Sequence, residues 1–370
     1  MLRKGTFILM KTKIQDMTSG SPGRLIILFA IPLMLGNICQ QLYTMVDTMV
    51  VGQVAGVEAL AALGAVDFLM WVVTGISTGL TQGFSIQLSQ YYGAKDFENL
   101  RKSLAHSYRL TAFIAAGVLI LSQSFASLVL TGLHTPSNII GMSLLYLRII
   151  FCGIPATAAY NMFASALRAM GNSKTPLTAM IIASVLNVSL DILFVAGFGW
   201  GVAGAAIATV IAQSFSAVYC FLILRRIDIV HLTRADFMPA SGMNARLMKL
   251  GIPVVFQNII IGVGGLVVQY VINGYGFLFV AGFTATNKLY GLLEMAAISY
   301  GYAIVTYVGQ NLGAGKIDRI KKGVRSSMLL SLLTSLIISA AMFLFGKNIL
   351  SLFISGEPQQ TQQVLSLIHI

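Results

Sequence analysis

Nine apolar runs, separated by short polar connections, constrain how this chain can fold more than any other feature. Each run is long enough to cross a bilayer, because a spanning helix needs about 20 residues. The sequence is 56% hydrophobic and only 10% charged over 370 residues, whereas soluble domains carry about 25% charged residues. We therefore expect an all-α, polytopic, multi-pass protein of the cytoplasmic (inner) membrane.

The apolar runs predict about nine transmembrane helices. Two of them, 58–90 and 278–309, exceed one bilayer thickness, so tilts, kinks or extensions beyond the membrane are expected there. The predicted helices span 25–51, 58–90, 102–131, 139–167, 176–196, 201–225, 247–272, 278–309 and 324–354.

Among the connections between the runs, only alternate ones carry Lys or Arg. The net charge is +12, but these residues form no single patch, so nucleic-acid binding is not expected. In membrane proteins, connections rich in Lys and Arg lie on the cytoplasmic side. The N-terminus is therefore predicted to be cytoplasmic. The basic residues of the later connections are Lys95, Arg101, Lys102, Arg168, Lys174, Arg225, Arg226, Arg234, Arg246, Lys249, Lys316, Arg319, Lys321, Lys322 and Arg325.

The chain also repeats itself. An Ile-Pro pair, followed by Asn five residues after the Pro, begins at Ile31 and again at Ile252, a shift of 221. A second motif, Gln followed by Gly-Ala, begins at Gln90 and again at Gln310, a shift of 220. The six helices between the copies are an even number, so both copies enter the membrane from the same side, as in transporters with parallel repeats.

The repeat divides the chain into four expected parts. These are a cytoplasmic leader at 1–24, an N-lobe of six transmembrane helices at 25–225, a cytoplasmic linker at 226–246 and an incomplete C-lobe at 247–370. The last part holds three transmembrane helices and a tail that we expect to be truncated, because no counterparts of the fourth to sixth helices follow.

One acidic residue, Asp47, lies inside the first apolar run. An ionisable group there costs about 2.5–3.5 kcal/mol on insertion scales, so it is usually retained for a function. Asn187 and Asp191, at i and i+4, share one face of a later helix, and Thr209 lies at a similar depth on the next one. These four residues are candidate ligands for a proton or Na⁺, although each acid could instead pair within the bundle.

A substrate cavity is the second candidate site. Tyr43, Met70 and Trp71 could line it, with Glu294 from the second copy, although packing or lipid contact is the simpler explanation for any single one. The glycine-lysine pair ending at Lys316 lacks the rest of a phosphate-binding loop. No catalytic set and no other metal site are present, so we expect neither an enzyme nor a cofactor, only H⁺ or Na⁺ as a coupling ion.

Four segments together carry a family resemblance. They are IPLMLGNICQQLYTMVDTMVVGQ at 31–53, ALRAMGNSKTP at 166–176, NVSLDILFVAGFGWGVAGAAIATVIAQ at 187–213 and VGQNLGAGKIDRIKKG at 308–323. They resemble the multidrug and toxic compound extrusion (MATE) family. The resemblance implies a twelve-helix, two-lobe fold that exports organic cations and other amphiphiles, driven by H⁺ or Na⁺. It places the family's coupling residues at Asp47, Asn187, Asp191 and Thr209.

We therefore expect an ion-coupled secondary transporter that exports amphiphilic small molecules by alternating access. Its partners would be these substrates and the lipid bilayer, without nucleic acid, and it would act as a monomer. A lipid-linked saccharide flippase of the same superfamily is an alternative, for which Arg148 and Lys288 offer few cationic groups. The other alternative is a non-functional truncated fragment.

Overall fold

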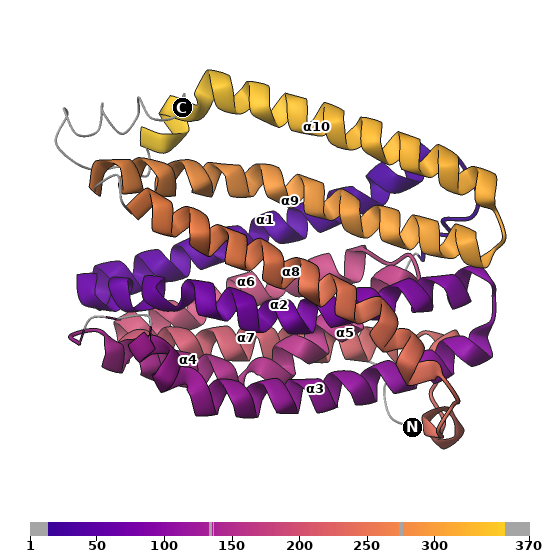
Figure 1. Cartoon of the computed structure of the whole chain (residues 1–370), viewed down its shortest axis with the longest axis horizontal. Helices are drawn as coiled ribbons and strands as arrows, with labels where there is room; N and C mark the ends of the chain where they lie inside the picture. Colours follow the sequence, from indigo (N-terminus) through magenta and orange to yellow (C-terminus); the bar gives the residue numbers. More distant parts are fainter. Residues whose placement is uncertain (1–13, 133–134, 136, 274–276, 352–370) are drawn as a thin grey trace, which may run out of the picture.

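The fold is a bundle of helices that run side by side along its longest axis (Figure 1). The computed structural model describes residues 14–132, 135, 137–273 and 277–351, and these contain helices and no strands, which confirms the all-α prediction. The helices are α1 (Pro22–Val54), α2 (Val57–Gly93), α3 (Phe97–Gly132), α4 (Ile140–Cys152), α5 (Ile154–Ala169), α6 (Lys174–Asp191), α7 (Gly201–Leu224), α8 (Met243–Asn273), α9 (Phe277–Gly313) and α10 (Ile317–Ser351).

Three shorter elements complete the described fold. A π-helix, η1 (Ile192–Gly197), continues α6, and two 3₁₀-helices, η2 (Asp228–Val230) and η3 (Arg234–Phe237), lie in the predicted linker. Residues 1–13 of the predicted leader and the tail after residue 351 lie outside the described residues.

Each predicted apolar range corresponds to one helix, with one exception. The range 139–167 was expected as an uninterrupted helix and is instead broken into α4 and α5, which are bent by 46°. Pro155, in the first turn of α5, has no backbone N–H to continue the helix. A Cβ atom on Gly153 would lie 2.7 Å from Val210 Cγ2 of α7, so a glycine fits the break.

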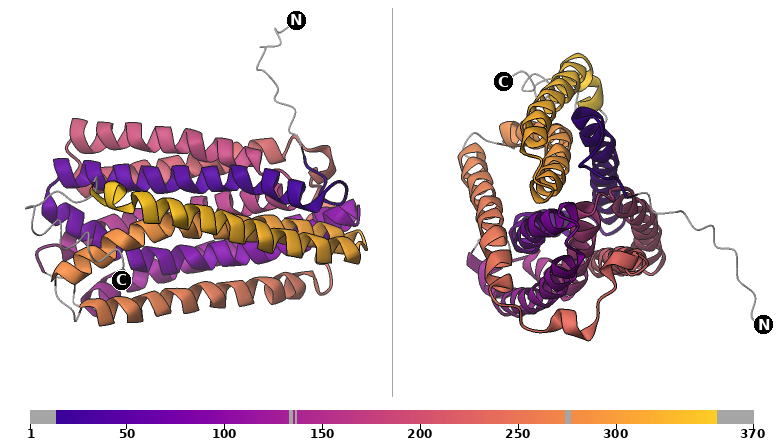
Figure 2. Two further views of the ribbon diagram at one scale, coloured as in Figure 1. Left: turned by 90° about the horizontal axis from the view of Figure 1, so that it is seen from above. Right: turned by 90° about the vertical axis from the view of Figure 1, so that its right-hand side faces the viewer.

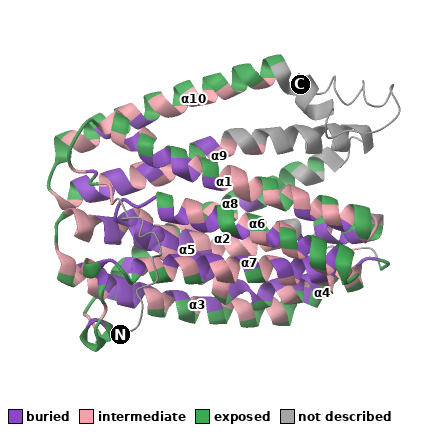
Figure 3. Cartoon of the chain, turned by 180° about the vertical axis from the view of Figure 1, so that it is seen from behind, coloured by how far each residue is buried: buried purple, intermediate pink, exposed green. Residues whose placement is uncertain are grey.

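Seven described helices are long and apolar enough to cross a membrane, or eight if α4 and α5 form one span. Many of their large apolar side chains are exposed. Leu332, Ile337 and Phe343 of α10 are examples, and Figure 3 shows that this helix carries mainly exposed and intermediate residues. Lipid can cover such surfaces, and helices satisfy their own backbone groups in it. The total of nine spans stays a prediction.

The basic connections gather at one end of the bundle, the right-hand end in Figure 1, which we call the basic end. There the Gln310 side chain of α9 donates to the Ala169 carbonyl at 2.8 Å and accepts from the Met17 N–H at 3.0 Å. Lys316 donates to the Thr18 carbonyl at 2.9 Å. Residues 15–20 therefore join the end of α5 to the turn between α9 and α10.

The two copies of the sequence repeat pack on each other reciprocally. α2 packs along α8 and α1 packs along α9, as the end-on view of Figure 2 shows. The repeated asparagines take part in this pairing: Asn37 of α1 donates to Ser299 Oγ at 3.1 Å, and Asn258 of α8 donates to the Gly75 carbonyl of α2 at 3.1 Å. The equivalent asparagines thus both bond to the other copy, although their partners Ser299 and Gly75 are not equivalent positions.

Candidate functional site

The structure brings the four predicted ion ligands together where α1, α6 and α7 pack against one another. Asp47 of α1 is buried, as are Asn187 and Asp191 of α6. The Asn187 amide lies 3.5 Å from Thr209 Oγ1 on α7, at the limit of a hydrogen bond. Asp47 and Thr209 face one common cavity.

A change of helix type occurs at this cluster. Asp191 is the last residue of α6, and the π-helix η1 starts at Ile192. π-Helical turns are rare and are frequent at functional sites. Asn187 and Asp191 lie on the α-helix that precedes the change, where residues at i and i+4 share one face. The pattern of apolar residues in the sequence gave no sign that the helix type changes.

Several oxygens of the cluster lack a partner within the part of the chain that the structure describes. Neither carboxylate oxygen of Asp191 has a hydrogen bond there, and the Asn187 Oδ1 atom has none. Buried polar atoms are normally paired, because leaving one unpaired costs about 1–3 kcal/mol. A proton or a hard cation, which takes oxygen ligands, would satisfy these atoms, so the residues present fit the predicted coupling ion.

A cavity of about 410 Å³ lies beside the cluster. Asp47 and Thr209 line it, so the ion ligands open onto a space that can hold a small molecule. The predicted cavity residues Tyr43, Met70 and Trp71 line it too.

A second cavity, of about 430 Å³, adjoins the first between the two repeat copies. It is lined by Glu294 of α9 and by Trp71, which belongs to both cavities. The four residues predicted to line a substrate cavity therefore do line these two spaces. The other residues common to both are Asn37, Gln40, Thr74, Thr78 and Tyr302.

Sequence reasoning missed several polar residues of the first cavity. Arg168 was used only for topology, yet it lines the cavity, and its guanidinium lies 4.7 Å from the centre of the Tyr302 ring. Gln213 donates to the Tyr43 hydroxyl at 3.4 Å. In the sequence, an arginine one residue before the end of a helix looks like any cation at the end of a membrane span. Nothing in the sequence indicated that its side chain points into the cavity.

Arg148, another charged candidate, does not belong to the site. It is one of the two cationic groups named for the flippase alternative, and its side chain is exposed. It lies on α4, where its carbonyl accepts a bond from Gln123 at 2.8 Å. The side chain of Lys288 lies outside what the structure describes.

Comparison with known proteins identifies the family. The sequence model of the MatE family matches residues 32–193 and 253–369 of this chain. The chain belongs to the MatE family. The two matched segments start 253 − 32 = 221 residues apart, which equals the shift of the Ile-Pro motif.

Curated relatives agree with the MatE assignment. The probable multidrug resistance protein YpnP of Bacillus subtilis is 31% identical over 346 residues, which cover 94% of this chain and 77% of that protein. The multidrug export protein MepA of Staphylococcus aureus is 21% identical over 332 residues, 89% of this chain and 73% of that protein.

Solved structures share the MatE fold. A MATE family transporter of the MOP superfamily in an outward-facing conformation superposes with a TM-score of 0.90 at 23% identity, covering 96% of this chain and 80% of that one. A MOP superfamily transporter from Pyrococcus furiosus also gives a TM-score of 0.90 at 23% identity, over 96% of this chain and 79% of that one. The chain is thus a multi-pass membrane protein of a transporter family.

Proposed function

We propose that this MatE chain exports amphiphilic organic cations and is driven by H⁺ or Na⁺. The single observation that carries the proposal is the position of Asp47, which lies in the buried ion-ligand cluster and also lines the cavity. Ion and substrate can therefore act on one carboxylate. The names of the relatives, probable multidrug resistance and multidrug export proteins, support a drug-like substrate.

Coupling would arise from charge at the cluster. The cluster holds two buried carboxylates, those of Asp47 and Asp191, and a bound proton or cation would offset their charge. Binding would neutralise Asp47 and weaken its hold on a cationic substrate in the cavity. The ion does this work only if it binds the two conformations of the protein with different affinities.

The packing at the basic end supports alternating access. α2 and α9 meet there without intervening side chains: a Cβ atom on Gly93 or on Gly313 would collide with the backbone of the other helix. This contact holds α2 and α9 together at the basic end in this conformation. If that end is cytoplasmic, as the positive-inside rule predicts, loading from the cytoplasm requires α2 and α9 to separate.

The alternative function, flipping of a lipid-linked saccharide, needs several cationic groups for its phosphate-containing head. Among the described residues that line the two cavities, Arg168 is the single Arg or Lys. The acidic groups Asp47 and Glu294 share these cavities. The charge balance of the described lining thus favours cationic substrates over a pyrophosphate-linked one.

Transport by the purified protein in vesicles tests the proposal. Efflux of ethidium, a fluorescent organic cation, is followed under a H⁺ gradient and, separately, under a Na⁺ gradient. We expect one of these gradients to drive efflux in the wild type, and Asp47→Asn to abolish it, because Asn keeps the size of Asp without its charge. Asp191→Asn should reduce efflux less completely, since Asp47 keeps one carboxylate.

Asp228→Asn is the matched control, because it makes the same chemical change at an exposed position in the linker. It should transport at the wild-type rate. Wild-type rates in Asp47→Asn, at equal amounts of protein in the vesicles, would show that the carboxylate is structural. Transport that ignores both gradients would refute ion coupling.

A further inference from the structure

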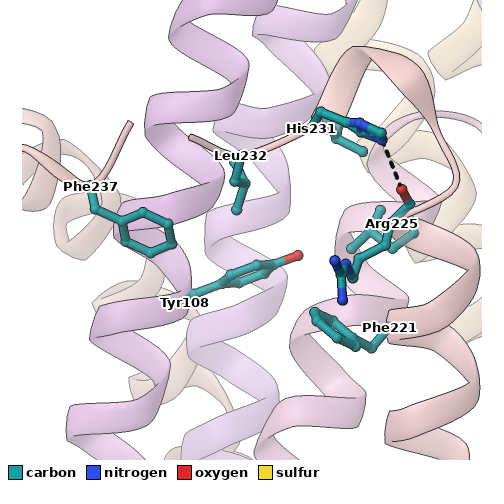
Figure 4. A pocket seen from close by; sticks show the side chains of 8 residues that line it. Tyr108, Phe221, Arg225, His231, Leu232 and Phe237 are labelled. Carbon is teal, nitrogen blue, oxygen red and sulfur yellow. Dashed lines mark hydrogen bonds between the residues drawn. The ribbon is translucent and has the colours of Figure 1, made fainter. Parts of the chain in front are cut away.

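A pocket of about 540 Å³ lies at the basic end, away from the cavities described above. It is formed by α3, the end of α7 and the connection that contains η2 and η3. Figure 4 shows its walls: the rings of Tyr108, Phe221 and Phe237 with Leu232, and the side chains of Arg225 and His231 on one side. The pocket therefore combines an apolar interior with two basic groups.

The basic side of the pocket is held in place by its own contacts. The Arg225 guanidinium lies over the Phe221 ring, 5.5 Å from its centre. His231 Nε2 donates to the Arg225 carbonyl at 3.3 Å. Within the described residues Arg225 forms no ion pair, and the Tyr108 hydroxyl points toward it (Figure 4). A guanidinium and a hydroxyl directed at one space form a binding site for an anionic group.

An apolar groove lies beside this pocket. It has a volume of about 350 Å³ and shares Tyr108 with the pocket. Its walls come from α3 between Tyr108 and Leu119 and from α5 between Pro155 and Phe163, and small residues such as Ala112 and Ala159 leave the space between them.

The groove lies on a surface suited to lipid. Phe113 and Ile120, on the same stretch of α3, are 79% and 64% exposed. The stretch from Tyr108 to Leu119 rises about 16 Å at 1.5 Å per residue. This is close to half of a hydrocarbon core about 30 Å thick. The groove therefore has the depth of one leaflet, with its charged end at the basic end of the bundle.

We propose that an anionic phospholipid binds here, with its phosphate on Arg225 and one acyl chain in the groove between α3 and α5. The basic end supplies the charge complementarity, because juxtamembrane Lys and Arg attract anionic lipids. A bound lipid would lie between the linker and the bundle, and the linker joins α7 to α8. The lipid would thereby fix the linker against α3 and α7.

Lipid binding to the purified protein tests this proposal. Phosphatidylglycerol or phosphatidylcholine is added to protein in a non-ionic detergent, and bound lipid is counted by native mass spectrometry while Tm is measured in parallel. The wild type should retain one phosphatidylglycerol more tightly than phosphatidylcholine and gain Tm with it. Arg225→Gln should weaken phosphatidylglycerol binding about tenfold or more, as expected for losing a charged hydrogen bond.

Matched variants separate the pocket from general surface charge. Arg226→Gln removes the neighbouring exposed arginine, which does not line the pocket, and should leave binding unchanged. Ala159→Leu fills the groove and should abolish retention, whereas Ala341→Leu on the exposed face of α10 should not.

Three results would overturn the proposal. The first is equal retention of both lipids by the wild type. The second is an equal loss in Arg225→Gln and Arg226→Gln, which would indicate a diffuse charge effect. The third is the same rise in Tm with water-soluble glycerol phosphate, which would identify a phosphate site that uses no acyl chain. None of these results depends on transport.

Discussion

Gly93 of α2 packs directly against the backbone carbonyl of Gln310 in α9. The reverse contact is also present, since Gly313 packs against the carbonyl of Gln90. These four residues are the second repeated motif of the sequence, so the two copies contact each other through the same glycine. The close approach of α2 to α9 at the basic end depends on the absence of two side chains.

Gly93→Ala should disfavour this close packing of α2 on α9. Alanine is the better helix former by about 1 kcal/mol, but here its methyl group must push α2 away from α9, and overpacking costs about 1–3 kcal/mol. We expect a lower Tm and greater labelling of a cysteine placed at the basic end. Gly117→Ala is the control, because a Cβ atom on Gly117 in α3 meets nothing within 4 Å. Equal Tm values and equal labelling in the two variants would show that the packing at Gly93 does not hold α2 against α9.

Residues 15–20 should stabilise the same end through Gln310. Its side chain bonds to the N–H of Met17 and to the carbonyl of Ala169, both buried. Gln310→Ala would leave these backbone groups unpaired, at about 1–3 kcal/mol each. We expect a lower Tm and faster proteolysis of the segment before α1. Gln53→Ala, at an exposed position near the far end of α1, should leave both measurements unchanged, and an equal effect there would rule out a specific role for Gln310.

Thr209→Ala should separate the two candidate coupling ions. A hydroxyl is a ligand for Na⁺ but does not titrate, so its loss should raise the Na⁺ concentration needed for half-maximal efflux while H⁺-driven efflux is retained. Thr209→Ser keeps the hydroxyl and should behave as the wild type. The measurement is the initial efflux rate at a series of Na⁺ concentrations in vesicles. Equal loss under both gradients would indicate that Thr209 acts through packing or through its contact with Asn187.

Asp16 should make stability depend on pH. Partial burial raises the pKa of its carboxyl group, but hydrogen bonds from Thr18 and Ser19 outweigh this and lower it below its ordinary value. The charge of Lys316 lowers the Asp16 pKa further. A lowered native pKa means that the ionised group stabilises the fold above its unfolded pKa, about 4, and that this is lost as pH falls through the native value.

Asp16→Asn should therefore lower Tm at pH 7, and the difference from the wild type should shrink as the pH is taken below about 4. The effect will be small, because the group is exposed and solvent screens it. Thermal unfolding of both proteins across this pH range is the measurement. A difference in Tm that does not vary with pH would assign the effect to hydrogen bonding alone.

The orientation of the basic end is tested by labelling. A cysteine introduced at Arg234, in a variant without the native cysteines, should resist a membrane-impermeant reagent in intact cells if the linker is cytoplasmic. It should react once the cells are opened. Ready labelling in intact cells would reverse the predicted topology.

The sequence by itself determined the helices and their approximate ends. The predicted ranges 25–51 and 58–90 became Pro22–Val54 and Val57–Gly93, and the repeat at Ile31 and Ile252 matched the two segments of the family model. Such features depend on the hydropathy of consecutive residues, because a segment of about 20 apolar residues can cross the bilayer as a helix. The buried acids Asp47 and Asp191 were found for the same reason. A charged residue in an apolar run can be recognised without knowing which other helices pack around it.

The tertiary structure alone decided which side chains face the cavities and which face lipid. Arg148 lies inside the predicted range 139–167 and Arg168 just after it, yet Arg148 is exposed and Arg168 lines a cavity against Tyr302. The close packing of α7 on Gly153 likewise involves Val210, 57 residues away in the sequence. Contacts with other helices fix the rotation of a helix about its axis and its local bends. Because these helices are apolar on all sides, their sequences show no periodic pattern that would indicate which side makes those contacts.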